Sequence, residues 1–415
     1  MVGSGGKMSR KFIPLLVIGC SAKTPDFGPG DDPDTDPKGL HASCKADSGL
    51  ILNTPDEDDF SEYYAKGFDR YTYVSAPNGG IIPIFAQDEI TEGQLLRARG
   101  LLSFFLTDVP ASDFGSDKSE VANAMVNNGA VLMMPNGEHE EGNEPNLDAQ
   151  PLYFSETPED GSKWFLNNNF NHRDAAFEEI FHLVHDQGIG SSEPAALPDY
   201  QELLRNAAEE ALANGIWGRP IYPDVAEWLD ELRREDSLAQ EYIAAVIDSY
   251  YGLWGPWDAT DGGMWGIYIA KTREEIQQRD PIGMNLLQSF LPAYLTQEIR
   301  LAESLKDDFL LTFDENIPYT HKSRYFVNVT LQGTADIRIF GNDQDNTLRG
   351  NSGDNTLYGA AGQDTVVYCD PISDYAIRWD EDVLIIESEN DGMDQLDEVE
   401  WVHFADGLIQ TTELQ

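Results

Sequence analysis

The sequence predicts an α+β fold in two parts: a mostly helical domain with a few strands, followed by a parallel β-roll, or β-solenoid. The first part is predicted because helical and strand-like apolar patterns alternate over residues 59–332. The second is predicted because a nine-residue pattern repeats in frame within residues 333–415. A length of 415 residues leaves room for both domains.

Local signals divide the first part into helices and strands. Thr91 is a candidate N-cap for one helix, and Gly129 is a candidate stop for the next. A turn signal, "NGG", precedes the first strand. The predicted strands are 81–87 and 130–134, and the predicted helices are 91–109, 116–129, 173–190 (ending at Gly188), 199–215 and 236–255.

The second part contains three successive nonapeptides from Gly341 onward: GNDQDNTLR, GNSGDNTLY and GAAGQDTVV. Each begins with glycine and carries Leu or Val at its eighth position. Glycine permits the tight turns of a roll, and the apolar residue of each short strand stacks into a narrow core.

These nonapeptides resemble the RTX repeat, GGxGxDxUx, and the resemblance implies that calcium binds between adjacent turns. The sixth position of that motif supplies a carboxylate, but here it reads Asn346, Asn355 and Asp364. An amide brings no charge to a divalent cation, so the alternative is a metal-free roll held by Asn ladders and Leu stacking. The candidate calcium ligands are Asp343, Asp345, Asp354 and Asp364.

The predicted helix at 173–190, RDAAFEEIFHLVHDQGIG, concentrates carboxylates and imidazoles in one segment. At about 100° per residue, Glu178, His182 and His185 fall within an arc of roughly 60°, and the opposite side is apolar. Two imidazoles and a carboxylate one turn apart are suitable ligands for zinc or a similar metal. An ordinary solvated helix face would give the same pattern.

Residues 178–182, EEIFH, resemble the His-Glu-x-x-His helix of zincin metallopeptidases, with Glu178 in place of the first histidine. The resemblance implies that His182 is a zinc ligand and that Glu179 is the general base that activates water. His185 is a candidate substitute for the missing imidazole.

Some zincins take a further zinc ligand from a glutamate on a later helix. Glu241, within QEYIAAVIDSYYG, is the corresponding candidate here. The segment AVLMM at 130–134 resembles the edge strand that precedes the zincin motif helix. The implied activity is zinc-dependent hydrolysis of a peptide or protein substrate. The alternative is a zincin-like domain that has lost activity.

The N-terminus carries an export pattern. Arg10 and Lys11 precede a short apolar run that ends in Val-Ile-Gly-Cys, which resembles a bacterial lipobox with Cys20 as the lipidated residue. We expect a signal at 1–20 and an acidic Pro/Gly linker at 21–58. A lipid on Cys20 would anchor the protein to a membrane without spanning it. An ordinary secretory signal is the alternative.

Two cysteines remain, Cys44 and Cys369, which either pair in an oxidising compartment or stay as two buried thiols.

Charge excludes one class of partner. The chain has 74 acidic and 27 basic residues, a net charge of −47, and such a surface repels nucleic acid. No Walker loop, dinucleotide fingerprint or Gly-x-Ser-x-Gly elbow is present. We therefore expect an exported zincin-like metalloprotein of the cell envelope or extracellular medium, with zinc and calcium as cofactors. A non-catalytic calcium-binding surface or adhesion protein is the alternative.

Overall fold

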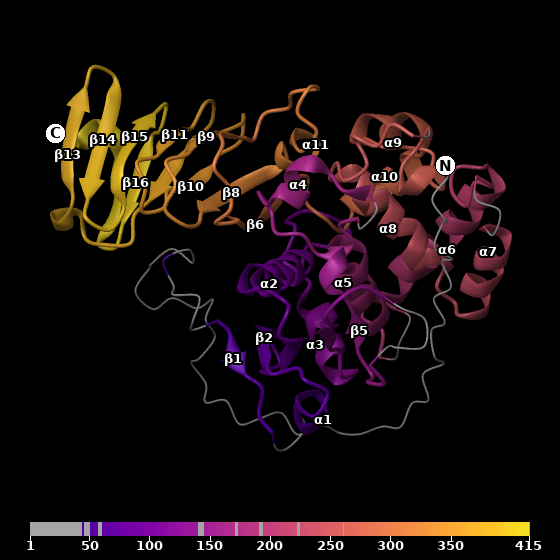
Figure 1. Cartoon of the computed structure of the whole chain (residues 1–415). Coiled ribbons are helices and arrows are strands. Elements are labelled where there is room, and N and C mark those ends of the chain that lie inside the picture. Colours follow the sequence, from indigo (N-terminus) through magenta and orange to yellow (C-terminus); the bar gives the residue numbers. More distant parts are fainter. Residues whose placement is uncertain are drawn as a thin grey trace, which may run out of the picture.

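The structure is a computed structural model that describes Cys44 and residues 50–56, 60–139, 145–170, 173–190, 194–221, 225–259 and 261–414. The predicted signal with Cys20, and most of the predicted linker, lie outside these residues. The chain forms a helix-rich body from which a β-rich arm projects (Figure 1). The mixture of helix and strand agrees with the predicted α+β class.

The body contains a five-stranded sheet in the order β1-β2-β3-β4-β5. Strands β1 to β3 are antiparallel, whereas β3, β4 and β5 run parallel. The strands are β1 Leu52–Asn53, β2 Arg70–Ser75, β3 Ile81–Ala86, β4 Leu132–Met134 and β5 Gln150–Pro151. The prediction that 130–134 forms an edge is wrong, because β5 pairs with the outer side of β4. A two-residue strand containing proline has no periodicity to detect.

All five predicted helices form. They correspond to α2, α3, α5, α6 and α8, and Thr91 caps α2 by accepting a hydrogen bond from the Gln94 amide. The helices are α1 Ser61–Tyr64, α2 Glu92–Leu106, α3 Ser119–Asn127, α4 Lys163–Asn167, α5 Ala176–Val184, α6 Pro198–Ala213, α7 Val225–Arg234, α8 Leu238–Tyr250, α9 Arg273–Arg279, α10 Pro281–Gln288 and α11 Thr320–Ser323. Short 3-10 turns lie at Phe154–Glu156, Met264–Gly266, Ile372–Asp374 and Thr411–Glu413.

Helix α5 ends earlier than predicted and continues as a π-helical turn over His185–Ile189. This turn packs on α3. A Cβ atom at Gly188 would lie 2.8 Å from a methyl carbon of Val121, so the close approach of α3 requires glycine there. Helix α8 is buried along its length and packs against α5, α6 and α10, which places it at the centre of the body.

The arm is a β-roll made of two six-stranded sheets. One has the order β17-β16-β12-β10-β8-β6, and the other β13-β14-β15-β11-β9-β7. The strands are β6 Leu295–Leu301, β7 Phe309–Leu310, β8 Phe326–Leu331, β9 Arg338–Phe340, β10 Thr347–Arg349, β11 Thr356–Tyr358, β12 Thr365–Val367, β13 Ala376–Asp380, β14 Val383–Ser388, β15 Gly392–Asp397, β16 Trp401–Phe404 and β17 Gly407–Gln410.

The eighth-position residues behave as the repeat predicts. Leu348 and Val366 lie in one sheet, Leu357 lies in the other, and none of the three is accessible to solvent. Their neighbours in the parallel ladders, such as Val329 beside Leu348 and Leu396 beside Leu357, extend the same core.

The roll sheets begin before the repeats do. Strand β6 pairs in parallel with β8, and β8 pairs in parallel with the first-repeat strand β10. Helix α2 of the body packs on β6. A disulfide between Cys44 and Cys369, with a Cα–Cα distance of 5.2 Å, resolves the alternatives left open by the sequence and ties the N-terminal segment to the roll.

Candidate metal centres

The polar stripe of α5 is not a solvated face. Every residue of the helix is buried, and Glu178, Glu179 and His182 are at most 2% exposed. The apolar side packs on α2, where Phe177 and Phe181 contact Phe105, while Arg173 and, from α8, Glu241 cover the polar side. Burying a charged group is costly unless a partner neutralises it, so this arrangement needs compensating charges or an ion.

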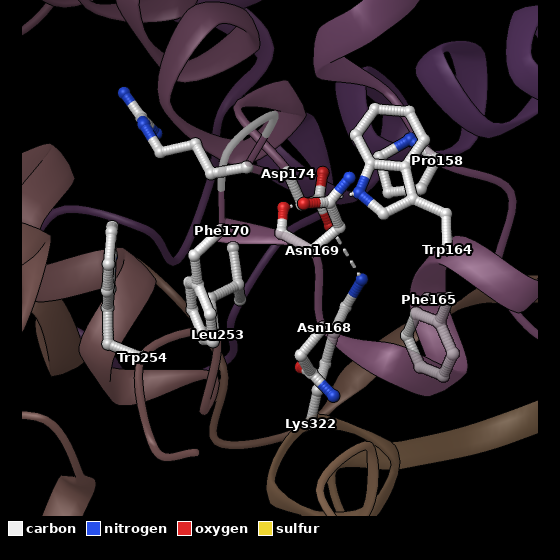
Figure 2. Close-up of a pocket in the computed structure, with 11 residues that line it drawn as sticks. Pro158, Trp164, Phe165, Asn168, Asn169, Phe170, Asp174, Leu253, Trp254 and Lys322 are labelled. Carbon is white, nitrogen blue, oxygen red and sulfur yellow. Dashed lines mark hydrogen bonds and ion pairs between the residues drawn. The ribbon is translucent and has the colours of Figure 1, made fainter. Parts of the chain in front are cut away.

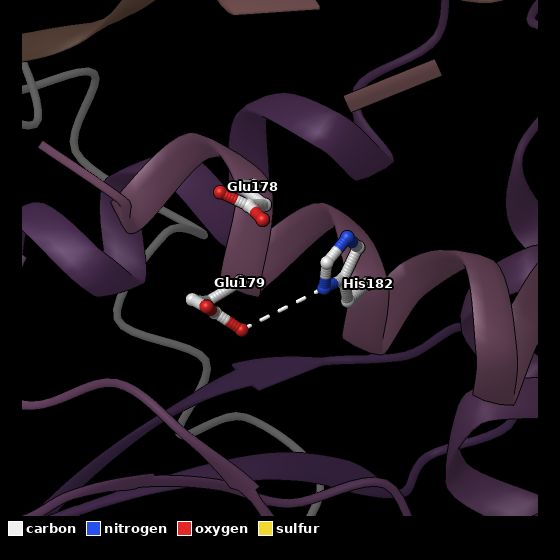
Figure 3. A group of neighbouring side chains, drawn as sticks. All are labelled: Glu178, Glu179 and His182. Carbon is white, nitrogen blue, oxygen red and sulfur yellow. Dashed lines mark ion pairs between the residues drawn. The ribbon is translucent and has the colours of Figure 1, made fainter. Parts of the chain in front are cut away.

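Three of these side chains form a group with the spacing of metal ligands (Figure 3). One ligand atom each from Glu178, Glu179 and His182 lies within 4.8 Å of the other two. Glu179 Oε2 lies 3.6 Å from His182 Nδ1, and Glu241 Oε1, from α8, lies 3.8 Å from His182 Nε2. The sequence-predicted glutamate from the later helix therefore reaches the imidazole of α5.

The two glutamates contact opposite nitrogens of one ring, and this separates their possible roles. A cation bound at Nε2 of His182 would have Glu241 beside it. Glu179 faces Nδ1 and accepts a hydrogen bond from Gln150 Nε2 of β5 at 2.8 Å. These contacts suit a group that orients the ring, whereas the sequence assigned Glu179 to the activation of water.

His185 stays outside this group. It begins the π-helical turn, its ring lies near that of Phe181, and Nδ1 is 3.4 Å from Asp186. The angular count ignored distance along the axis. Glu178 and His185 are seven residues apart, which is about 10.5 Å of rise.

Sequence reasoning missed Arg173, which leads into α5. Its guanidinium pairs closely with Glu178, lies 3.5 Å from Asp248 and stacks over the ring of Trp265 at 5.2 Å. The sequence does place an arginine five positions before Glu178, but only the packing of the folded chain shows that the two side chains pair. Arg173 now supplies to Glu178 the positive charge that a metal would otherwise supply.

The cluster is rich in negative charge. Burial raises the pKa of Asp248 to about 7, against the opposing effects of Arg173 and Trp254. Burial alone would lower the pKa of His182, but the surrounding carboxylates, Glu241 first, outweigh it and raise that pKa. The surrounding carboxylates therefore make the charged form of the imidazole more favourable than it is in water. The donor set of one imidazole and several carboxylates fits zinc, but Glu178 is available only if Arg173 releases it.

A pocket of about 40 Å³ is lined in part by residues that come just before α5 in the sequence (Figure 2). Its lining includes Arg173 and Asp174, with aromatic side chains such as Trp164 and Trp254, but none of the four candidate zinc-site residues from α5 and α8. This volume accommodates only a few water molecules.

The roll contains the second candidate centre. The exposed carboxylates Asp343, Asp345 and Asp354 each accept a hydrogen bond, from Gln344 Nε2, Gln363 N and Met393 N respectively. Asp364 differs because it is fully buried. Its Oδ1 accepts from Asn346 N at 2.7 Å, whereas Oδ2 has no hydrogen-bond partner among the described residues.

The turn at Asp364 brings two oxygen atoms close to Gly359. A Cβ atom at Gly359 would lie 2.7 Å from Oδ2 of Asp364 and 2.1 Å from the carbonyl oxygen of Glu398. Carboxylate and carbonyl oxygens are the ligands that calcium prefers. Burial, opposed by the hydrogen bond from Asn346 and reinforced by Glu400 and Asp345, raises the pKa of Asp364 to about 6.

Comparison with known proteins supports the roll. Residues 338–367 match the family described as RTX calcium-binding nonapeptide repeat (4 copies). No curated protein matches the chain. Within the described part of the chain, no helix has both the length and the apolar character needed to cross a bilayer. The chain thus carries, over 338–367, repeats of a calcium-binding family that is typical of secreted or extracellular proteins.

Proposed function

We propose that this chain is an exported calcium-binding protein whose roll orders around calcium outside the cell, and whose body is a non-catalytic zincin-like module of the cell envelope or medium. The observation that carries the proposal is the buried Oδ2 of Asp364, which has no hydrogen-bond partner among the described residues and lies within the repeats that match the calcium-binding family. The expected partners are calcium and, through a lipid on Cys20, a membrane.

Two features of α5 favour a non-catalytic body. Glu178 and Asp248 already pair with Arg173, and Glu178, Glu179, His182 and Glu241 are at most 4% exposed as residues. A peptide bond must come within hydrogen-bond reach of the group that activates water, and burial of this degree prevents such an approach.

Calcium should stabilise the protein markedly. Ligand at a hundred times its dissociation constant adds about 2.7 kcal/mol to the free energy of unfolding, so millimolar calcium should raise Tm by several degrees over the same protein in EGTA. Differential scanning calorimetry measures this shift. Magnesium is the control, because it demands a smaller octahedral site and should give little change. Equal Tm values in calcium and in EGTA would contradict the proposed calcium binding.

A second candidate function is metal-dependent peptide hydrolysis, and the contact between Glu241 of α8 and His182 of α5 favours it. Zinc would be held by His182 with Glu241 and a released Glu178. There it would polarise a carbonyl and activate water. In this chain Glu179 and Gln150 would orient the imidazole.

The peptidase candidate predicts stoichiometric zinc in purified protein and cleavage of casein that a chelator abolishes. Glu241→Gln should remove a charged zinc ligand and lower zinc affinity, while Glu179→Gln, which loosens the orientation of the imidazole, should lower zinc affinity or activity about 10- to 100-fold. Glu120→Gln, on the exposed side of α3, is the matched control and should behave as wild type. Metal analysis that finds no zinc, together with intact casein, leaves the non-catalytic module.

A further inference from the structure

The turns of the roll share one geometry but differ in what fills it. The first glycine of each nonapeptide faces the sixth-position side chain. A Cβ atom at Gly341 would lie 2.7 Å from Oδ1 of Asn346, one at Gly350 would lie 2.6 Å from Oδ1 of Asn355, and one at Gly359 would lie 2.7 Å from Oδ2 of Asp364. The same close approach therefore recurs at each turn, from an amide oxygen at Gly341 and Gly350 and from a carboxylate oxygen at Gly359. At Gly350, Oδ2 of Asp394 also approaches, at 2.9 Å from such a Cβ atom.

At the first turn, amide nitrogens take the backbone carbonyls. Asn342 Nδ2 donates to the carbonyl of Phe326 at 2.9 Å, and Asn346 Nδ2 donates to Asn342 Oδ1 at 3.0 Å. Asn346 Oδ1 in turn accepts from the Asn342 amide at 2.9 Å. These N–H groups donate hydrogen bonds to the oxygens that a cation would need as ligands. The turn is therefore held by hydrogen bonds alone, without a bound ion.

The second turn, on the other edge of the roll, repeats this arrangement. Asn351 Nδ2 donates to the carbonyls of Gln332 and Ala335, each at 3.1 Å, and Asn355 Nδ2 donates to Ala335 at 3.2 Å. Asn355 Oδ1 accepts from the Asn351 amide at 2.8 Å. In both turns the sixth-position Oδ1 accepts from a backbone amide and the side-chain amide nitrogens donate to oxygens of the chain.

Asp394 follows the second turn on that edge, and protein donors satisfy it. Oδ1 accepts from the Asn355 amide and Oδ2 accepts from the Tyr368 hydroxyl, each at 3.0 Å. Burial raises the pKa of Asp394 to about 8, against the effect of both hydrogen bonds, so this carboxyl favours its neutral form near pH 7. A neutral acid whose oxygens already accept is a poor calcium ligand.

Asp364 is the exception. Its Oδ2 is buried without a hydrogen-bond partner among the described residues, and both this oxygen and the Glu398 carbonyl approach Gly359 closely. Glu400 Oε2 accepts from the Asp364 amide at 2.8 Å, which brings a second carboxylate to the turn. Here negative charge gathers where the other turns place N–H or O–H donors.

We infer that calcium binds the roll at one turn, formed by residues 359–364 and 398–400, and that amide and hydroxyl groups of the chain replace the ion at the turns of Asn346, Asn355 and Asp394. The inference rests on the proposed calcium-binding function and deepens it. The roll is then a hybrid, with two turns closed by asparagine, one closed by Asp394 and its protein donors, and one completed by an ion.

Isothermal titration of the chelator-stripped full chain with calcium chloride, in high salt to suppress weak surface binding, tests this inference. We expect one strong site per chain. Asp364→Asn should weaken it at least tenfold, whereas Asp382→Asn should stay within twofold of wild type. Asp382 is an exposed residue between β13 and β14 and gives the same change of charge.

A second measurement holds even if Asp364→Asn folds poorly. Asn355→Ala should lower Tm by the same amount in calcium and in EGTA, because its amide bonds to protein. Two or more strong sites, wild-type affinity in Asp364→Asn, or an Asn355→Ala effect confined to calcium would each overturn the inference while leaving calcium binding intact. No calcium binding by wild type would instead remove the proposed function itself.

Discussion

Replacing Lys322 with methionine should lower the free energy of unfolding by about 3–5 kcal/mol. Lys322 Nζ lies 2.9 Å from Asp160 Oδ1 and 2.9 Å from Asp174 Oδ2, and Arg97 pairs with both carboxylates at 3.0 and 2.6 Å. All four side chains are at most 13% exposed. Without Lys322, two buried carboxylates share one guanidinium, and the uncompensated charge destabilises the fold.

Urea denaturation followed by tryptophan fluorescence measures this loss. Lys306→Met is the matched control, because that lysine is exposed and donates to the carbonyl of Glu303 nearby in the chain, and its loss should change stability by less than about 0.5 kcal/mol. A Lys322→Met protein as stable as this control would show that the network contributes nothing.

The same network predicts a dependence on pH. Burial alone would raise the pKa of Asp174, but Arg97 and Lys322 lower it to about 2 from an ordinary value of 3.8. The stabilisation is therefore complete above pH 4 and is lost as pH falls toward 2. Lys322→Met should flatten this acid limb of the stability profile.

Reduction of the disulfide between Cys44 and Cys369 should cost about 5 kcal/mol, the second large effect. The bond closes a loop across a sequence separation of 325 residues, and cross-links that span long loops restrict the unfolded chain most. Calorimetry with and without dithiothreitol measures the change in Tm. The variant with serine in place of both Cys44 and Cys369 should have the lower Tm without any reductant, and dithiothreitol should not change it. Unchanged Tm on verified reduction would contradict the prediction.

The sequence was a good guide wherever the signal is local. Thr91 caps α2 as predicted, and the nine-residue period placed Leu348 and Leu357 in the roll core because each turn repeats the same short-range geometry. The helix α5 was also predicted, but its environment was not. Periodicity distinguishes a polar face from an apolar one, and it contains no information about what covers the polar face.

Contacts between distant segments account for the differences between the predicted metal site and the structure. Glu241 was placed beside His182 through a resemblance, whereas the pairing of Arg173 with Glu178 depends on how two segments pack and leaves no periodic trace. His185 was grouped with Glu178 by angle alone, and the rise along the helix separates them. The pairing of Cys44 with Cys369 was one of two open alternatives, since spacing alone does not choose a partner.

The recruitment of β6 and β8 into the roll has a consequence for the order of assembly. A solenoid stacks each turn on the one before it, so its first turn needs a ready-made platform. Here that platform is Leu295–Leu301 and Phe326–Leu331, held against α2. The repeats are thus stacked on strands that precede them in the chain, and a fragment starting at the repeats would lack the strand against which its first strand pairs.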